Sequence, residues 1–172
     1  MLSLSPFPLV DLAGATQDFA GDRAALICFV KEDCPTCREV MPVLAAMHAT
    51  LSPTLPFLVI GQTAEGNATL QQDFDLPFSL LDDSALKVSF ATAIETVPTL
   101  LVTDAAGQVT AQQVGFVRGD WQSLVDALVT QQSVAAPDLD WQALPEWRPG
   151  CGSLSVDPIH AARLQAEADH SP

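Results

Sequence analysis

Two cysteines separated by two residues, Cys34 and Cys37, carry the clearest chemical signal in the sequence. They follow residues 25–30, an apolar run that predicts a buried strand, and Pro35 stands where proline favours the first position of a helix. The start of a helix has unpaired N–H groups and a positive partial charge, and both stabilise a thiolate, the reactive form of cysteine. We therefore expect Cys34 to be an exposed nucleophile and Cys37, one turn deeper, to resolve the mixed disulfide that Cys34 forms.

The same two cysteines would also serve as half of a metal site, because pairs at this spacing often bind zinc. A structural zinc ion needs about two further cysteine or histidine ligands, usually from a second close pair. The remaining cysteines and histidines form no such pair; they are Cys28, Cys151, His48, His160 and His170. No metal or cofactor is therefore expected, and a module that holds or carries a soft metal with Cys34 and Cys37 is kept as the alternative to redox chemistry.

The rest of the chain predicts the elements that must position this dithiol. Short apolar runs alternate with helical patterns, which predicts a mixed sheet with helices on both faces. The expected strands are residues 25–30, 57–60, 99–102 and 109–114, with shorter extended pieces at 7–12 and 78–81. The expected helices are residues 35–52, 67–74, 83–91 and 120–131, with Asp83 or Ser84 capping the third. Beyond residue 132 only residues 157–168 predict a regular element, a short helix.

Several motifs of the sequence resemble the thioredoxin fold. They are Cys34-Pro35-Thr36-Cys37 after a strand, Pro42 inside the following helix, and Thr96-Val97-Pro98-Thr99 before another strand. Three further segments resemble the redoxin branch of this fold, which includes peroxiredoxins and TlpA-like thiol-disulfide oxidoreductases. They are residues 8–14, residues 74–82 and the turn at 104–107. The resemblance implies an α/β thioredoxin-like domain at residues 1–132, with a mixed central sheet flanked by helices. An irregular C-terminal extension, residues 133–172, is expected to be partly ordered and packed on this domain.

The resemblance also implies an activity and its site residues. It implies an enzyme, a thiol-disulfide oxidoreductase, in which the two motif cysteines are catalytic and exchange disulfides with protein thiols. Pro35, Thr36, Val97 and Pro98 would form the substrate-docking surface, with Pro98 cis so that the backbone of Val97 lies beside the sulfur of Cys34. The expected partners are a protein dithiol or disulfide and an electron donor that the sequence does not identify.

Charge and hydropathy exclude other classes of protein. Acidic residues outnumber basic ones by 21 to 7, so the formal net charge is −14. Nucleic-acid binding needs a surplus of lysine and arginine, so no nucleic-acid partner is expected. No run reaches the ~18 apolar residues of a transmembrane helix, and no basic residue precedes Arg23, so neither a membrane span nor a signal peptide is predicted. The sequence thus favours a cytoplasmic protein, or a periplasmic one if a signal has been removed.

Several further residues are weaker candidates for a role in redox chemistry or in binding. Cys28 is expected to be a buried, inert core residue, with a third thiol near the motif as the alternative. Cys151 lies between two glycines, which favour a tight turn, and is expected to be a free thiol on a loop. The alternative for Cys151 is a regulatory or resolving role through a long-range disulfide. Trp141 and Trp147 are expected to anchor the extension. The charges nearest the dithiol are expected to be solvated: Lys31, Glu32, Arg38, Glu39 and Glu65.

Overall fold

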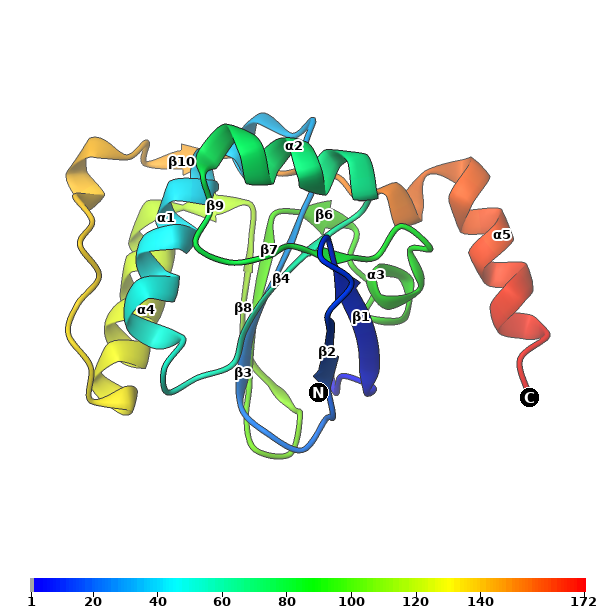
Figure 1. Cartoon of the computed structure of the whole chain (residues 1–172), viewed down its shortest axis with the longest axis horizontal. Helices are drawn as coiled ribbons and strands as arrows, with labels where there is room; N and C mark the ends of the chain where they lie inside the picture. Colours follow the sequence, from blue (N-terminus) through cyan, green and yellow to red (C-terminus); the bar gives the residue numbers. More distant parts are fainter. Residues whose placement is uncertain (1) are drawn as a thin grey trace.

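The computed structural model describes residues 2–172, and its centre is a mixed seven-stranded sheet (Figure 1). The strands lie in the order β2-β1-β5-β4-β3-β7-β8. Their bounds are β1 Phe7–Asp11, β2 Thr16–Phe19, β3 Ala25–Val30, β4 Phe57–Gly61, β5 Leu81–Asp82, β7 Thr99–Thr103 and β8 Val109–Val114. The central strand β3 pairs parallel with β4 and antiparallel with β7, which confirms the predicted mixed sheet.

Four helices follow the strands along the chain and cover the sheet. They are α1 Pro35–Leu51, α2 Ala64–Phe74, α3 Lys87–Ala91 and α4 Arg118–Gln132. Figure 1 shows α1 and α4 together on one side of the sheet and α3 on the other. Two short strands, β6 Thr96–Val97 and β9 Phe116–Val117, lie outside the main sheet at its upper end in this view.

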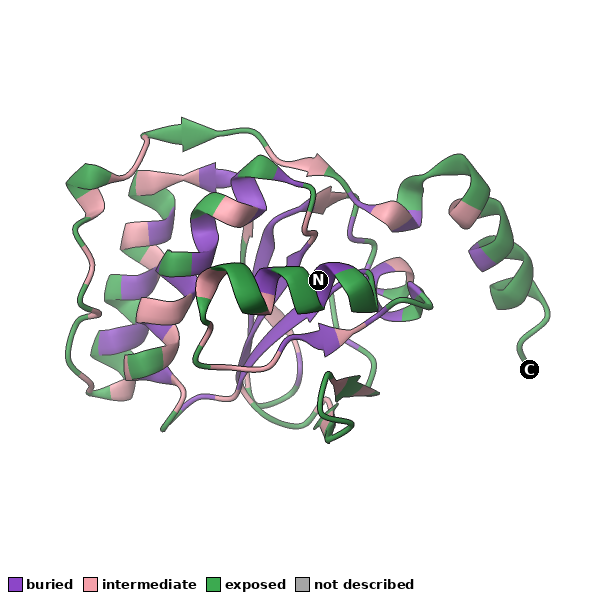
Figure 2. Ribbon diagram, turned by 45° about the horizontal axis from the view of Figure 1, so that its top comes forward, coloured by how far each residue is buried: buried purple, intermediate pink, exposed green. Residues whose placement is uncertain are grey.

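Burial on both faces explains why the central strand was predictable. All six residues of β3 are buried, and Figure 2 shows the strands at the centre of the molecule in the colour of buried residues. A strand covered on both sides reads as a continuous apolar run, without the alternation of a half-exposed strand. Helix α1 turns Met41, Leu44 and Met47 into the same core, while Pro42 lies on its exposed side. The chain therefore leaves β3 and enters α1 at one end of a rigid sheet, where the two motif cysteines lie.

The structure contains one strand that was not predicted, and two of the predicted helices begin at other residues. An unpredicted strand, β2, pairs with β1 as an N-terminal hairpin. Helix α2 begins three residues earlier than predicted, because the hydroxyl of Thr63 caps it by accepting the N–H of Gly66 at 3.0 Å. Helix α3 begins at Lys87 rather than at residue 83, and Asp83 does not occupy its N-cap position. The Asp83 carboxylate instead accepts the N–H groups of Val88 at 3.1 Å and Ser89 at 2.8 Å, inside the first turn.

The C-terminal extension crosses the end of the sheet rather than extending into solvent. In Figure 1 it runs beside α4 and α1, passes over the sheet at the top, and ends in α5 at the right. Its elements are η1 Trp141–Ala143, β10 Trp147–Arg148, β11 Cys151–Gly152, η2 Leu154–Val156 and α5 Pro158–Asp169. The helix predicted at 157–168 is thus confirmed. We call residues 146–156 the strap.

The two tail tryptophans differ in their surroundings. Trp141 packs against the core, as expected of an anchor, whereas Trp147 is 59% exposed, so the expectation that it buries its ring is wrong. Trp147 is held through its backbone, because β10 pairs antiparallel with β9. The extension is therefore attached at this point by strand pairing rather than by an aromatic side chain.

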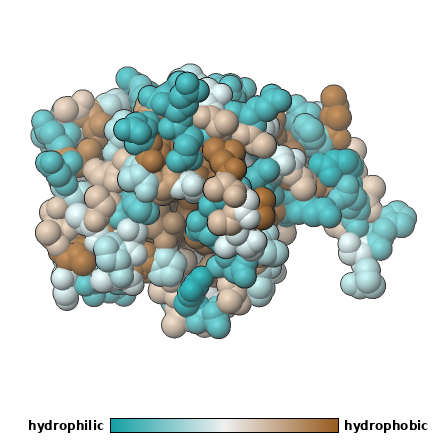
Figure 3. Space-filling model, in the orientation of Figure 1, coloured by the Kyte–Doolittle hydropathy of each residue, from teal (hydrophilic) through white to brown (hydrophobic). Residues whose placement is uncertain are grey.

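The surface seen in Figure 3 mixes hydrophilic residues with small groups of apolar ones. Within residues 2–172, no helix combines the length and the hydropathy that a membrane crossing requires. This agrees with the lack of a long apolar run in the sequence.

Candidate active site

Cys34 lies at the start of α1, where the helix backbone can act on its sulfur. It is the N-cap residue of α1, with an extended backbone, and its Sγ accepts the N–H of Cys37 at 3.3 Å. The Cys34 thiol also lies 3.5 Å from the carbonyl oxygen of Val97. The peptide bond between Val97 and Pro98 is cis, as the resemblance implied. The structure thus brings together two motifs that are far apart in the sequence.

Cys37 and Cys28 lie deeper, with no exposed surface. The Sγ of Cys37 accepts the N–H of Lys31 at 3.4 Å. Burial raises the pKa of the Cys37 thiol far above its usual range, and the hydrogen bond and charge of Cys34 raise it further. Burial alone raises the pKa of Cys28. The expected burial of Cys28 is confirmed, and both thiols stay protonated while Cys34 is reduced.

The surroundings of Cys34 favour its thiolate. The hydrogen bond from the Cys37 thiol is the largest influence and lowers the pKa of Cys34, while burial opposes it. Hydrogen bonds with Cys151 and with the backbone N–H groups of Cys37 and Thr36 also lower it, and all these effects together bring the pKa to about 6. At neutral pH the reduced protein therefore holds one negative charge on Cys34, shared by hydrogen bonds with two other thiols.

Cys34 is not exposed, which contradicts the prediction. Its exposed fraction is 0%, because the strap lies over it. Strand β11 of the strap pairs antiparallel with β6, with Cys151 opposite Val97 and Gly152 opposite Thr96. Cys151 therefore lies in a short strand beside Cys34, and the expectation of a thiol on a loop is wrong. All four cysteines, Cys28 included, are free thiols in this structure.

The strap is held over the motif by contacts with the start of α1. The hydroxyl of Thr36 donates to the carbonyl of Pro149 at 2.5 Å, and the ammonium group of Lys31 donates to the carbonyl of Gly152 at 2.9 Å. Lys31 is thus more than a solvated charge, since it binds the strap as well as pairing with Asp33 at 3.4 Å. These contacts use Thr36, a residue expected to dock substrate, to bind the chain's own extension.

A second anchor holds the far end of the strap. The side chain of Gln62, which is buried, donates to the hydroxyl of Ser153 at 2.7 Å and accepts the N–H of Leu154 at 2.9 Å. The hydroxyl of Ser155 donates to the carbonyl of Ile94 at 2.9 Å. Buried polar groups are costly to leave unpaired, so these bonds favour one fixed position of the strap. Sequence analysis missed Gln62, because nothing in its local pattern indicates a partner 92 residues away.

Two other charged candidates near the motif form ion pairs with residues elsewhere in the chain. Arg38 forms an ion pair with Asp73, and Glu39 pairs with Arg148 of the strap at 3.3 Å. Within residues 2–172, no group of three or more histidine, cysteine or acidic side chains is arranged to hold a metal ion.

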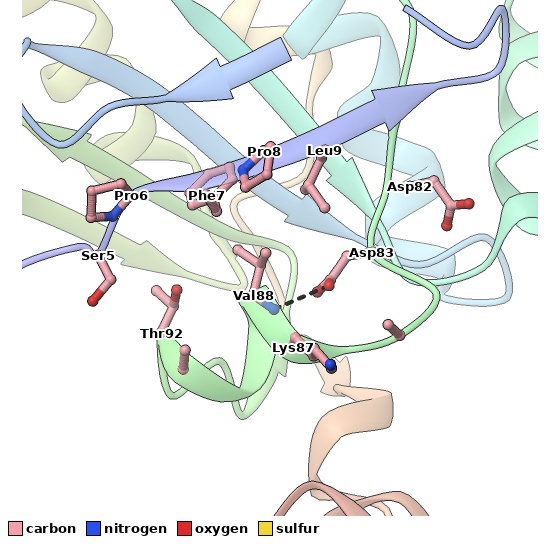
Figure 4. A pocket seen from close by; sticks show the side chains of 12 residues that line it. Ser5, Pro6, Phe7, Pro8, Leu9, Asp82, Asp83, Lys87, Val88 and Thr92 are labelled. Carbon is pink, nitrogen blue, oxygen red and sulfur yellow. Dashed lines mark hydrogen bonds between the residues drawn. The ribbon is translucent and has the colours of Figure 1, made fainter. Parts of the chain in front are cut away.

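A cavity of about 370 Å³ lies away from the cysteines, between β1 and α3 (Figure 4). Its lining is mostly apolar and includes Phe7, Leu9 and Val88. The Asp83 carboxylate at its edge is directed to the N–H of Val88, as the dashed line in Figure 4 shows. Burial raises the pKa of Asp83, but its oxygens already have partners in α3, so Asp83 is not a free acid for this cavity.

The thiolate can be titrated directly. In the reduced protein we expect the thiolate absorbance at 240 nm to rise through a midpoint near pH 6, because Cys34 ionises there. Cys37→Ala should move this midpoint to higher pH by more than Cys151→Ala does, since the Cys37 thiol is the stronger donor to the thiolate. Cys28→Ala is the matched control and should leave the midpoint in place. A wild-type midpoint near pH 9 would contradict the assigned hydrogen bonds.

Known structures share this fold at low sequence identity, whereas no family model and no curated protein matches the sequence. The thioredoxin domain of a thiol-disulfide oxidoreductase from Bacteroides vulgatus aligns with a TM-score of 0.60 and 17% identity, over 74% of this chain and 95% of that one. A secreted disulfide oxidoreductase from Mycobacterium tuberculosis, described as homologous to E. coli DsbE, aligns with a TM-score of 0.59 and 20% identity, over 73% and 95%. An uncharacterized conserved protein from Geobacillus kaustophilus aligns with a TM-score of 0.64 and 18% identity, over 87% and 88%.

These alignments establish the class of the fold. The chain has a thioredoxin-like fold, the fold of the thiol-disulfide oxidoreductases among these structures, as the sequence motifs implied. The first two alignments cover about three quarters of the chain.

Proposed function

We propose that the protein is a thiol-disulfide oxidoreductase that exchanges disulfides with protein thiols, with Cys34 as nucleophile and Cys37 as resolving thiol. The observation that carries this proposal is the position of the Cys34 sulfur. It lies at the N-terminus of α1, accepts the N–H of Cys37, and stands 3.5 Å from the backbone of Val97 beside cis Pro98. This arrangement supplies a thiolate and a strand edge for a bound chain at the same place.

The charge on Cys34 explains how the two cysteines act in order. The Cys34 thiolate attacks a substrate disulfide, forms a mixed disulfide, and releases the other substrate sulfur as a thiolate. Once Cys34 is bonded to the substrate it carries no charge, so its repulsion of a Cys37 thiolate disappears. The pKa of Cys37 then falls, and its thiolate attacks Cys34 Sγ to release the second substrate thiol. The products are an oxidised Cys34–Cys37 pair and a reduced substrate.

The docking surface is proposed on the same residues as the sequence predicted. Once the strap has lifted, an extended substrate segment would pair with β6 at Val97 and contact Pro35 and Thr36 at the helix start. Backbone pairing suits protein substrates of varied sequence, because it uses main-chain groups that every residue has. We propose that the domain of residues 1–132 carries this activity and that residues 133–172 modify access to it. The cytoplasmic location stays a prediction of the sequence.

The test combines turnover, potential and metal content. We expect the reduced protein to catalyse reduction of insulin disulfides by dithiothreitol, and the purified protein to contain no stoichiometric zinc or copper. We expect the Cys34–Cys37 couple to have a reduction potential between about −270 mV and about −120 mV. Redox proteins with these two potentials have attacking cysteines whose pKa values lie above and below the value of about 6 for Cys34. Stoichiometric soft metal without turnover would instead support the metal-carrier alternative.

A further inference from the structure

Cys151 occupies the place that the proposed function assigns to a substrate cysteine. It lies directly opposite Val97 in the β6–β11 pair, and the Val97 carbonyl is 3.5 Å from Cys34 Sγ. Hydrogen bonding with Cys151 is among the causes that lower the pKa of Cys34, as expected for two thiols at neighbouring positions. A substrate strand docked on the edge of β6 would place its reacting cysteine in the same position. The strap therefore lies where a substrate strand would dock, and Cys151 lies where the substrate cysteine would be.

The strap packs closely against β6 and is bound on both sides of Cys151. Gly150 lies against β6 so tightly that a Cβ atom there would be 2.2 Å from Cγ2 of Thr96 and 2.8 Å from the carbonyl oxygen of Val97. Thr36 and Lys31 bind carbonyl groups on either side of Cys151. Contacts on both sides of the thiol fix its position relative to Cys34.

We propose that Cys151 is a third redox-active cysteine that exchanges a disulfide with Cys34, and this inference rests on the proposed function. In the oxidised protein the Cys151 thiolate attacks Cys34 Sγ, a Cys34–Cys151 bond forms, and the Cys34–Cys37 bond breaks. Cys37 leaves as a thiolate and takes up the proton that Cys151 lost. One disulfide and one thiol are present before and after, so the step needs no external oxidant or reductant.

The exchange gives the protein two oxidised forms. In one form the disulfide joins Cys34 to Cys37, and in the other it joins Cys34 to Cys151 and locks the strap over the site. Cys37 can reverse the step by attacking Cys34, as it does in the proposed resolution of a substrate. The strap is thus an internal substrate for Cys34.

The test uses disulfide mapping in variants that lack the resolving thiol. Trypsin separates the cysteines usefully: residues 24–31 carry Cys28, residues 32–38 carry Cys34 and Cys37, and residues 119–163 carry Cys151, since Pro149 protects Arg148 from cleavage. Reduced Cys37→Ser protein is treated with glutathione disulfide, quenched in acid, alkylated and digested. Glutathione first forms a mixed disulfide with Cys34, and Cys151 then displaces it. We expect peptide 32–38 joined to peptide 119–163, with little glutathione on either.

Two double variants complete the test. In Cys37→Ser/Cys151→Ala we expect the glutathione adduct on Cys34 to be at least about tenfold more abundant, because neither of the thiols that could displace it remains beside Cys34. The matched control, Cys37→Ser/Cys28→Ala, should give the same joined peptides as the single variant. Equal glutathione adduct with and without Cys151, and no joined peptide, would overturn the inference and leave the proposed function standing. If Cys34 forms no disulfide in the wild type or in any variant, the proposed function fails and the inference fails with it.

Discussion

Replacing Cys34 with serine is expected to reduce insulin-disulfide turnover by roughly 10³-fold or more, because the variant has no other thiolate at the site. Cys37 is fully buried, and burial, the largest cause of its raised pKa, remains in the variant, so Cys37 cannot act as the attacking thiol. Burial and the neighbouring Cys34 together raise the pKa of Cys151 to about 11; burial, the largest cause, remains in the variant, so Cys151 stays mostly protonated at neutral pH. The measurement is the initial rate of turnover at pH 7, with dithiothreitol as reductant.

Cys28→Ala provides the comparison for this experiment. Cys28 is equally buried and lies in β3, but it makes no hydrogen bond with the Cys34 sulfur. The control should keep most of the wild-type rate, which separates loss of the nucleophile from loss of a cysteine in the core. Residual activity of more than a few per cent in Cys34→Ser would show that a different thiol begins the reaction.

Replacing Gly150 with alanine is expected to uncover Cys34. The added Cβ would meet Thr96 and the Val97 carbonyl at distances that atoms cannot adopt without displacement of the strap. Overpacking of this kind costs about 1–3 kcal/mol, which corresponds to an increase of about 5- to 150-fold in the population with the strap lifted. The rate of Cys34 alkylation by iodoacetamide in the reduced protein should rise by a similar factor.

Gly152→Ala is the matched control within the same strap. A Cβ at Gly152 would have no atom within 4 Å, so the substitution adds the same group without a clash. Its alkylation rate should remain close to that of the wild type. If both variants react at the wild-type rate, the strap does not limit access to Cys34.

The central elements could be predicted because their signals are local. The continuous apolar run of β3 follows from burial on both faces, and Pro35 with the two cysteines identifies the start of α1. The start of α2 was missed because one hydroxyl, that of Thr63, extends the helix by capping it. The start of α5 could also be predicted from a local signal, because Asp157 caps this helix by accepting the N–H of Ile159.

The cover over the site could not be predicted, because it depends on contacts between distant parts of the chain. The bond from Lys31 to the carbonyl of Gly152 spans 121 residues, and β10 and β11 are each only two residues long. Strands this short leave no periodic pattern in a sequence. The cysteine motif therefore predicted the place of Cys34 at the start of α1 but not its burial.

The attachment of the strap at both ends decides which molecules can compete for Cys34. One end pairs with β9, and the other is bound by Gln62, so Cys151 remains tethered beside the thiolate even when the middle of the strap lifts. A group held by a short tether acts at an effective concentration on the order of millimolar or above. A small thiol or disulfide must reach comparable concentrations to displace Cys151. Under the proposed function, a protein substrate that adds side-chain contacts along β6 would displace it at far lower concentration, and we expect the tether to favour macromolecular partners over small ones.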